Sequence, residues 1–310
     1  MTSGDHSSSN FAAALHSGKF VITAEVAPPV SADPADLLNR ALPLKGVATA
    51  VNLTDGAGAK AHMSSIASAV LLMQNGIEPI LQMTCRDRNR LALESDLIGA
   101  AALGIRNVLI LTGDDPKQGD QPDAKPVFDF NSQGLLQVAD KLRRDKQLPT
   151  GTAVKGVLDF TLGGADMPLD PPADWQPKSL TAKIDAGADF VQTQFCMDTK
   201  IVRNYAKRLL DLGVAQKLGI LIGVCPIPSA RSARWMKEKL FGTIIADAII
   251  DRLDKASDAK AEGTKICGEL IAELATIPGI AGAHVMAPAS MSAIPEAIAI
   301  SGVAGKPRAS

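Results

Sequence analysis

The sequence predicts a single-domain α/β protein with the (β/α)8 fold, a TIM barrel. Strand-like apolar runs alternate with helix-like segments eight times along the chain, which is the pattern of a parallel sheet wrapped by helices. The run Val108–Leu111 is apolar without interruption, as expected for a strand that is covered on both faces. It leads into Thr112, Gly113 and Asp114, and barrels place their chemistry at such strand ends.

Eight segments are expected to be the strands, since each is short, apolar and bounded by turn residues. They are Phe20–Val26, Thr49–Leu53, Pro79–Thr84, Val108–Leu111, Ala153–Phe160, Phe190–Gln194, Gly219–Val224 and Ala281–Met286. The expected helices are Asp36–Leu42, His62–Met73, Leu91–Ala102, Leu135–Leu142, Ser179–Ala186, Asp198–Leu212, Ser229–Leu240, Ile245–Lys255 and Gly263–Ala275.

A glycine followed closely by a small apolar residue recurs where a helix leads into a strand. The glycines are Gly46, Gly76, Gly104, Gly187, Gly213 and Gly279. Glycine past a helix end adopts the left-handed conformation that caps free carbonyl groups, and the apolar residue packs back on the sheet. A doubly wound open sheet is the alternative, but it needs an early GxGxxG turn, and none follows the first strand.

The composition is that of an ordinary globular protein. A chain of 310 residues that is 46% hydrophobic can bury a sizeable core, and a net charge of -1 favours neither nucleic acid nor an anionic membrane as partner. The four cysteines are too scattered for a zinc site or a disulfide framework, which favours reduced thiols in a cytoplasmic protein. The polar start of the chain predicts a disordered tail over residues 1–18, followed by the barrel over residues 19–310.

In a barrel, the ends of the strands meet at one mouth, so polar residues at those ends form a candidate site. They are Glu25, Thr54, Asp55, Gln82, Thr84, Asp114, Asp159, Gln194, Cys225 and the segment from His284 to Pro288. Glu25 is the strongest candidate, because an acid between Ala24 and Val26 is costly without a partner or a role.

Six motifs follow one another between about Phe20 and Val303. They are Glu25-Val26-Ala27-Pro28-Pro29, Thr54-Asp55-Gly56-Ala57, Thr84-Cys85-Arg86-Asp87-Arg88-Asn89, Gly113-Asp114-Asp115-Pro116, the segment from Lys183 through Gln194 to Asp198, and Gly282-Ala283-His284. Their residues and order resemble those of the methylenetetrahydrofolate reductase family. The resemblance implies a barrel that binds FAD and reduces 5,10-methylenetetrahydrofolate to 5-methyltetrahydrofolate, with NADH or NADPH as electron donor.

The same resemblance implies a role for individual residues. Glu25 would be the general acid that protonates N10 of the folate, and Asp114 would orient the pterin and stabilise positive charge as the folate ring opens. Gln194 and Met236 would also contact the substrate. The residues implied for cofactor binding are Thr54, Gln82, Thr112, Gly113, Asp114 and Lys183.

Some positions depart from the family's pattern. Gln82 stands where the family has histidine, and Thr112 stands where it has arginine. Ser232 and Met236 correspond to a glutamine and an aromatic residue, and the loop segment 162–171 lacks the family's histidine and glutamate. Trp235, next to Met236, is a candidate replacement for the aromatic residue.

Three functions therefore stay open. The first is a flavin-dependent reductase, and the second is a flavin-free relative that passes hydride directly from a reduced nicotinamide to the folate. The third is a folate-binding barrel, without catalysis of its own, that needs a partner protein for electrons. The expected partners are the tetrahydrofolate substrate and either a second copy of the chain or an electron-donor protein.

Overall fold

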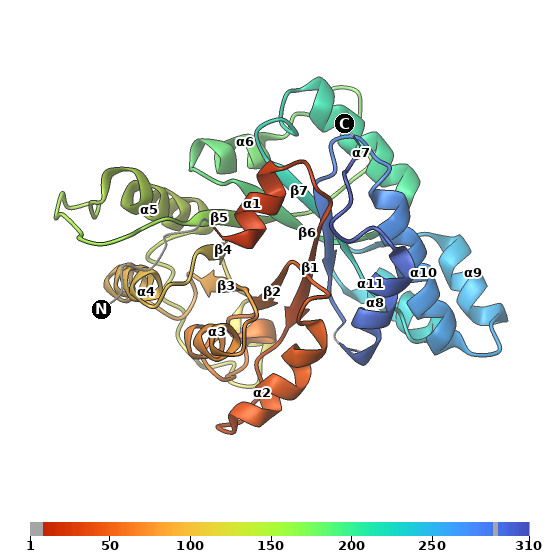
Figure 1. The fold of residues 1–310 in the computed structure, drawn as a ribbon, viewed down its shortest axis with the longest axis horizontal. Coiled ribbons are helices and arrows are strands. Elements are labelled where there is room, and N and C mark those ends of the chain that lie inside the picture. The colour runs from red at the N-terminus through yellow and green to blue at the C-terminus, as the bar shows by residue number, and fades with distance from the viewer. Residues whose placement is uncertain (1–8, 288–290, 310) are drawn as a thin grey trace.

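The computed structural model describes residues 9–287 and 291–309, and Figure 1 shows its fold. Within these residues, eight parallel strands form a closed barrel, which confirms the predicted fold class. They pair in the order β1-β2-β3-β4-β5-β6-β7-β9, and β9 pairs with β1 to close the ring. A short strand, β8, pairs with the end of β6 outside the ring. The strands are β1 (Val21–Val26), β2 (Ala50–Leu53), β3 (Pro79–Thr84), β4 (Asn107–Leu111), β5 (Thr161–Asp166), β6 (Phe190–Met197), β7 (Gly219–Val224), β8 (Ile244–Ile245) and β9 (Gly282–Val285).

Helices surround the barrel on its outside, except α1 (Asn10–His16), which lies across one end of the barrel (Figure 1). The surrounding helices are α2 (Pro34–Ala41), α3 (Ser65–Gln74), α4 (Arg90–Ala102), α5 (Ser132–Asp145), α6 (Lys178–Asp185), α7 (Thr199–Asp211), α8 (Ala230–Lys239), α9 (Asp247–Lys255), α10 (Ala259–Leu274) and α11 (Ile294–Ser301). In the described ranges, no helix combines the length and the apolar character that crossing a membrane requires.

The interior of the barrel changes from apolar to polar along the strands. Alternate residues of a strand point to the same face, so Val21, Thr23 and Glu25 share the inner face of β1. Val21 belongs to an apolar cluster at the amino ends of the strands, and Thr23 is fully buried above it. Glu25 comes next, on the wall of a cavity at the carboxyl ends.

The prediction of the fifth strand over Ala153–Phe160 is wrong, because β5 runs over Thr161–Asp166. Gly163 and Gly164 are typical of a loop, but here neighbouring side chains leave little room for a larger residue. A Cβ on Gly163 would overlap the ring of Phe190, and one on Gly164 would lie 3.1 Å from Cδ of Lys183. Asp159, expected at the mouth, therefore precedes β5 and lies at the opposite end of the barrel.

The structure also corrects the expected tail over residues 1–18, since Asn10–His16 form the helix α1. Ser9 caps this helix, and the Glu78 carboxylate accepts the backbone N–H groups of Asn10 and Phe11, both at 2.9 Å. Phe11 and Leu15 are buried in the apolar cluster at the amino ends of the strands. Helix α1 thus closes the barrel at the end away from the mouth (Figure 1), and residues 1–8 lie outside the described residues.

All four cysteines are free and buried, which makes the stability of the fold depend on pH. Burial raises the pKa of Cys85 to about 11 and that of Cys196 and Cys225 to about 12, because a buried thiolate loses its hydration. A thiol whose pKa rises on folding contributes its full stability below its unfolded value of 9.0 and loses it as the pH rises towards the folded value. We expect the free energy of unfolding in urea to fall from about pH 9 to about pH 11. In Cys196→Ala the free energy of unfolding should fall less over this range. An equal fall would show that the Cys196 thiol does not cause it.

Candidate active site at the mouth of the barrel

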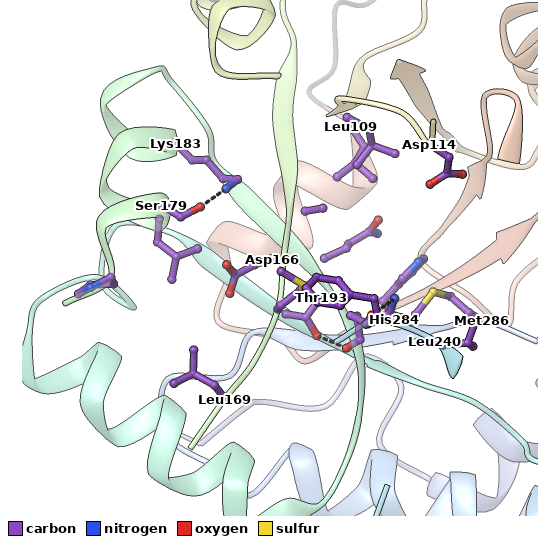
Figure 2. A pocket seen from close by; sticks show the side chains of 18 of the residues that line it. Leu109, Asp114, Asp166, Leu169, Ser179, Lys183, Thr193, Leu240, His284 and Met286 are labelled. Atoms are coloured by element: carbon purple, nitrogen blue, oxygen red, sulfur yellow. Dashed lines mark hydrogen bonds between the residues drawn. The ribbon is translucent and has the colours of Figure 1, made fainter. Parts of the chain in front are cut away.

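A cavity of about 890 Å³ opens at the carboxyl ends of the barrel strands, within the size range of ligand and cofactor sites. It brings together seven of the residues expected at the site, which are Glu25, Gln82, Asp114, Lys183, Gln194, His284 and Met286. Figure 2 shows Lys183 at one side of this cavity and Asp114 at the other. The strand ends therefore converge as the barrel fold predicts.

Glu25 lies at the end of β1, close to two nitrogen atoms from the barrel interior. Gln82 Nε2 donates to Glu25 Oε2 at 3.1 Å, and His284 Nε2 lies 3.6 Å from the same oxygen. The His284 side chain is 3% exposed, whereas that of Glu25 is 25% exposed. The carboxyl group is thus held from below and remains accessible from the cavity.

A layer of buried polar residues lies beneath Glu25 and crosses the barrel. Gln192 and Asn52 exchange hydrogen bonds through their side-chain amides, and Gln192 Nε2 also donates to Thr23 Oγ1 at 3.0 Å. Thr23 Oγ1 lies 2.9 Å from His284 Nδ1. Because all four side chains are buried, water does not compete for these hydrogen bonds, and the layer holds fixed positions.

Asp114 follows β4 and is held by neighbouring loops. Its Oδ2 accepts the N–H of Gly58 at 2.9 Å, and the buried Arg86 guanidinium donates to the backbone oxygens of Asp114 at 3.3 Å and Gly56 at 3.1 Å. Gly113 has a φ of +97°, and a Cβ there would lie 2.9 Å from Cβ of Arg86, so this turn requires glycine. The exposed carboxyl group of Asp114 therefore reaches the cavity from a fixed backbone.

Gln194 and Phe241 form another part of the wall. Gln194 Nε2 donates to the carbonyl oxygen of Phe241 at 3.3 Å, and its Oε1 accepts the N–H of Phe195 at 3.0 Å. Phe241 lines the cavity although it is 84% exposed. A flat ligand that covered this ring would remove a large apolar surface from water.

Asp166, at the end of β5, and Lys183, on α6, are two half-buried charged groups on the wall that influence each other's pKa. Burial raises the pKa of Asp166, against the opposing effects of a hydrogen bond from Tyr205 and the charge of Lys183. Burial lowers the pKa of Lys183, against the charge of Asp166, and Lys183 Nζ donates to Ser179 Oγ at 2.6 Å. For both groups, the attraction between the two charges is smaller than the cost of the hydration lost on burial. Such shifted pKa values are typical of charged groups at functional sites.

The start of α6 faces the same cavity. In the described residues, no side chain caps its first N–H groups, although the N–H of Lys178 donates to the carbonyl oxygen of Gln176 at 2.9 Å. Lys178, Ser179 and Lys183 line the cavity beside these N–H groups. Uncapped N–H groups at a helix start, together with lysine charges, are the features that bind phosphate. This corner therefore fits the diphosphate that FAD and the nicotinamide dinucleotides share.

Several residues expected at the site lie off this cavity wall, namely Thr54, Asp55, Thr84, Thr112, Gly113, Cys225 and Met236. The Thr84 N–H donates to Asp55 Oδ2 at 2.8 Å, and Cys225 lines a second pocket. Thr54 is buried after β2, and its hydroxyl has no hydrogen-bond partner in the described part of the chain. Thr112 is exposed, and Gly113 lines a separate surface pocket. Met236 lines an apolar pocket of about 260 Å³, which Trp235 also lines and which shares one wall residue with the main cavity.

Several residues on the wall have no counterpart among the sequence motifs, among them Asp166, Lys178, Ser179 and Phe241. Asp166 is an acid at a strand end, so the correct bounds of β5 would have revealed it. Lys178 and Ser179 follow a proline, which is a signal for a helix start. Phe241 has no such signal, because its place depends on the path of the chain after α8. Pro288, part of the expected rim, lies outside the described residues.

Comparisons with known proteins agree with the motifs. A family model described as "Methylenetetrahydrofolate reductase" matches residues 10–302. A Caenorhabditis elegans protein named "Probable methylenetetrahydrofolate reductase (NADPH)" is 28% identical over 223 residues, which are 69% of this chain and 31% of that protein. The "5,10-methylenetetrahydrofolate reductase" of Pectobacterium carotovorum subsp. carotovorum is 26% identical over 218 residues, 68% of this chain and 65% of that protein. The chain thus spans less than two thirds of the length of either relative.

A solved structure has the same fold. It is described as "Uncharacterized protein from Clostridium thermocellum binds two copies of 5-methyl-5,6,7,8-tetrahydrofolic acid", and it superposes with a TM-score of 0.63 at 13% identity. The match covers 94% of this chain and 97% of the other. Since the family model spans nearly all of the sequence, this chain belongs to the methylenetetrahydrofolate reductase family.

Proposed function

We propose that this protein reduces 5,10-methylenetetrahydrofolate to 5-methyltetrahydrofolate by hydride transfer. The observation that carries the proposal is that Glu25, Asp114 and Gln194 line the same cavity, at the mouth of a barrel of this family. The names of the C. elegans and P. carotovorum relatives and the methyltetrahydrofolate bound by the C. thermocellum protein support it.

Glu25 acts as the general acid. Its proton goes to N10 of the folate, the bond between N10 and the methylene carbon breaks, and an electrophilic iminium forms at N5. Hydride then adds to the methylene carbon, so one proton and one hydride convert the methylene bridge into an N5-methyl group. Gln82 and His284 hold the carboxyl group in place from the barrel interior.

Asp114, Gln194 and Phe241 bind and orient the folate. The Asp114 carboxylate stabilises the positive charge that develops as the ring opens. Gln194 carries both a donor and an acceptor for the pterin edge, which it offers when it releases its backbone partners. The exposed ring of Phe241 covers a flat face of the ligand.

Asp114→Asn should lower the rate of folate reduction by about 10²-fold, because the neutral amide does not stabilise the positive charge. Reduction of bound FAD by nicotinamide should change much less, since no cationic folate forms in that half-reaction. Stopped-flow absorbance measures the two half-reactions separately. Asp115→Asn is the matched control, because Asp115 is the exposed neighbour of Asp114. An asparagine at this position can still accept the backbone N–H of Lys117, as Asp115 does. Equal losses in both half-reactions would make Asp114 a structural residue.

FAD is the proposed cofactor, and Gln82, Asp114 and Lys183 are the residues on the wall that would hold it. When bound, FAD supplies a carrier for hydride between a reduced nicotinamide and the folate. Lys178 and Lys183 would neutralise the diphosphate, and the Ser179 hydroxyl and the uncapped N–H groups of α6 would donate to it.

A flavin-free reductase is the second candidate. It is favoured by the positions of Thr54, Thr112 and Gly113, three expected flavin contacts that lie off the cavity wall. In this case NADPH, the donor in the name of the C. elegans relative, would bind beside the folate with its diphosphate at the start of α6.

The absorbance spectrum of the purified protein tests the proposal. An oxidised-flavin spectrum that NADH or NADPH bleaches and methylenetetrahydrofolate restores is the expected result. A colourless protein that oxidises NADPH only when methylenetetrahydrofolate is present would establish the flavin-free reaction. Absence of folate reduction with either donor would contradict both, and would leave a folate-binding barrel that depends on an electron-donor protein.

A further inference from the structure

We propose that Thr23 and His284 fix Glu25 so that its Oε1, and not its Oε2, delivers the proton to the substrate. His284 is then a positioning residue that acts through Glu25. This inference rests on the proposed function, in which Glu25 is the general acid.

The strand register places these three residues together. Thr23 and His284 are directly paired where β1 runs beside β9. Because side chains alternate along a strand, Glu25 lies on the same face as Thr23, one step nearer the mouth. Thr23 is 0% and His284 2% exposed, so their contacts are shielded from water.

The Thr23 hydroxyl determines the tautomer of His284. Thr23 Oγ1 accepts a hydrogen bond from Gln192 Nε2 at 3.0 Å and lies 2.9 Å from His284 Nδ1. Among the described residues, Nδ1 is the acceptor in reach of the hydroxyl hydrogen, so a fully satisfied network leaves Nδ1 unprotonated. His284 therefore carries its hydrogen on Nε2, the nitrogen that faces Glu25.

The side-chain nitrogen atoms of Gln82 and His284 both lie close to the same carboxyl oxygen of Glu25. Gln82 Nε2 donates to Glu25 Oε2 at 3.1 Å, and His284 Nε2, which carries the ring hydrogen in this tautomer, lies 3.6 Å from the same oxygen. A carboxyl hydrogen on Oε2 would compete with these donors, whereas no described side chain donates to Oε1. The proton of the neutral acid thus lies on Oε1. Once the proton has left, the two donors stabilise the negative charge.

The tautomer can be measured without any assay of activity. In protein labelled with ¹⁵N-histidine, loss of a signal pair in His284→Gln assigns His284 among the four histidines of the chain. We expect an unprotonated Nδ1 and a protonated Nε2 in the unaltered protein and in Thr23→Ser, and a change in Thr23→Val, which lacks the hydroxyl. A protonated Nδ1 in the unaltered protein would overturn the proposal.

Kinetics test the positioning role. His284→Gln can place an amide N–H near the site of Nε2, whereas the shorter side chain of His284→Asn does not reach Glu25. We expect kcat to fall by about 10- to 100-fold in His284→Asn and KM to change by less than about twofold, with most of the loss recovered in His284→Gln. Thr23→Val should resemble His284→Asn, and Thr23→Ser should resemble the unaltered protein. Equal losses of kcat in His284→Gln and His284→Asn, or an effect on KM instead of kcat, would overturn the positioning role of His284.

Failure of the proposed function has a different signature. If Glu25→Gln kept normal turnover, Glu25 would not be the general acid, whatever the tautomer of His284. If His284 had the other tautomer while Glu25→Gln lost turnover, Glu25 would remain the general acid. The proposed positioning by Thr23 and His284 would then be wrong.

Discussion

Glu25→Gln is expected to lower kcat for methylenetetrahydrofolate reduction by about 10²- to 10⁴-fold, while the variant still folds and binds folate. Glutamine has the shape of glutamic acid, so it keeps the packing of the side chain beside Gln82 and His284. Its amide has no acidic proton for N10, so the ring must open without help from an acid. The measurements are kcat and the dissociation constant for the folate.

The matched control is Glu238→Gln. Glu238 is exposed on α8 and does not line the cavity, so the same chemical change there should leave kcat and folate affinity as they are. Turnover of Glu25→Gln close to that of this control would remove Glu25 from the mechanism. A loss of folate affinity without a loss of kcat would make Glu25 a binding residue.

The barrel could be predicted because its repeat depends on local signals. All six glycines expected at the joints between helices and strands have positive φ, as their role in capping helices requires. They are Gly46, Gly76, Gly104, Gly187, Gly213 and Gly279. Each of these signals concerns a few neighbouring residues, so the sequence reveals it without knowledge of the packing.

The fifth strand could not be found in this way, because the reason for its glycines lies elsewhere in the chain. Gly163 makes room for Phe190, and Gly164 makes room for Lys183, both of which follow later in the sequence. Local propensity treats two glycines as a loop, whereas here both pair within β5, between β4 and β6. The same error moved the expected strand end from Asp166 to Asp159.

The candidate site was predictable to the extent that it consists of strand ends. Glu25, Gln82, Asp114 and Gln194 each follow from the position of a strand, and the structure places all four on one cavity wall. The contacts beneath them were not predictable. The hydrogen bonds that run from Asn52 through Gln192 and Thr23 to His284 join four strands, and no local pattern encodes such a network.

Phe11→Ala should destabilise the protein by about 3–5 kcal/mol, because it leaves a cavity at the closed end of the barrel. The Phe11 ring is fully buried and packs edge-on against Phe190, with 4.8 Å between the ring centroids. Urea unfolding measures the loss, and His16→Ala, an exposed change on the same helix, should cost less than about 0.5 kcal/mol. Because the mouth lies at the other end, KM for the folate should not change below the unfolding transition. If Phe11→Ala were as stable as His16→Ala, α1 would contribute nothing to the barrel, and the expectation of a tail up to residue 18 would be restored.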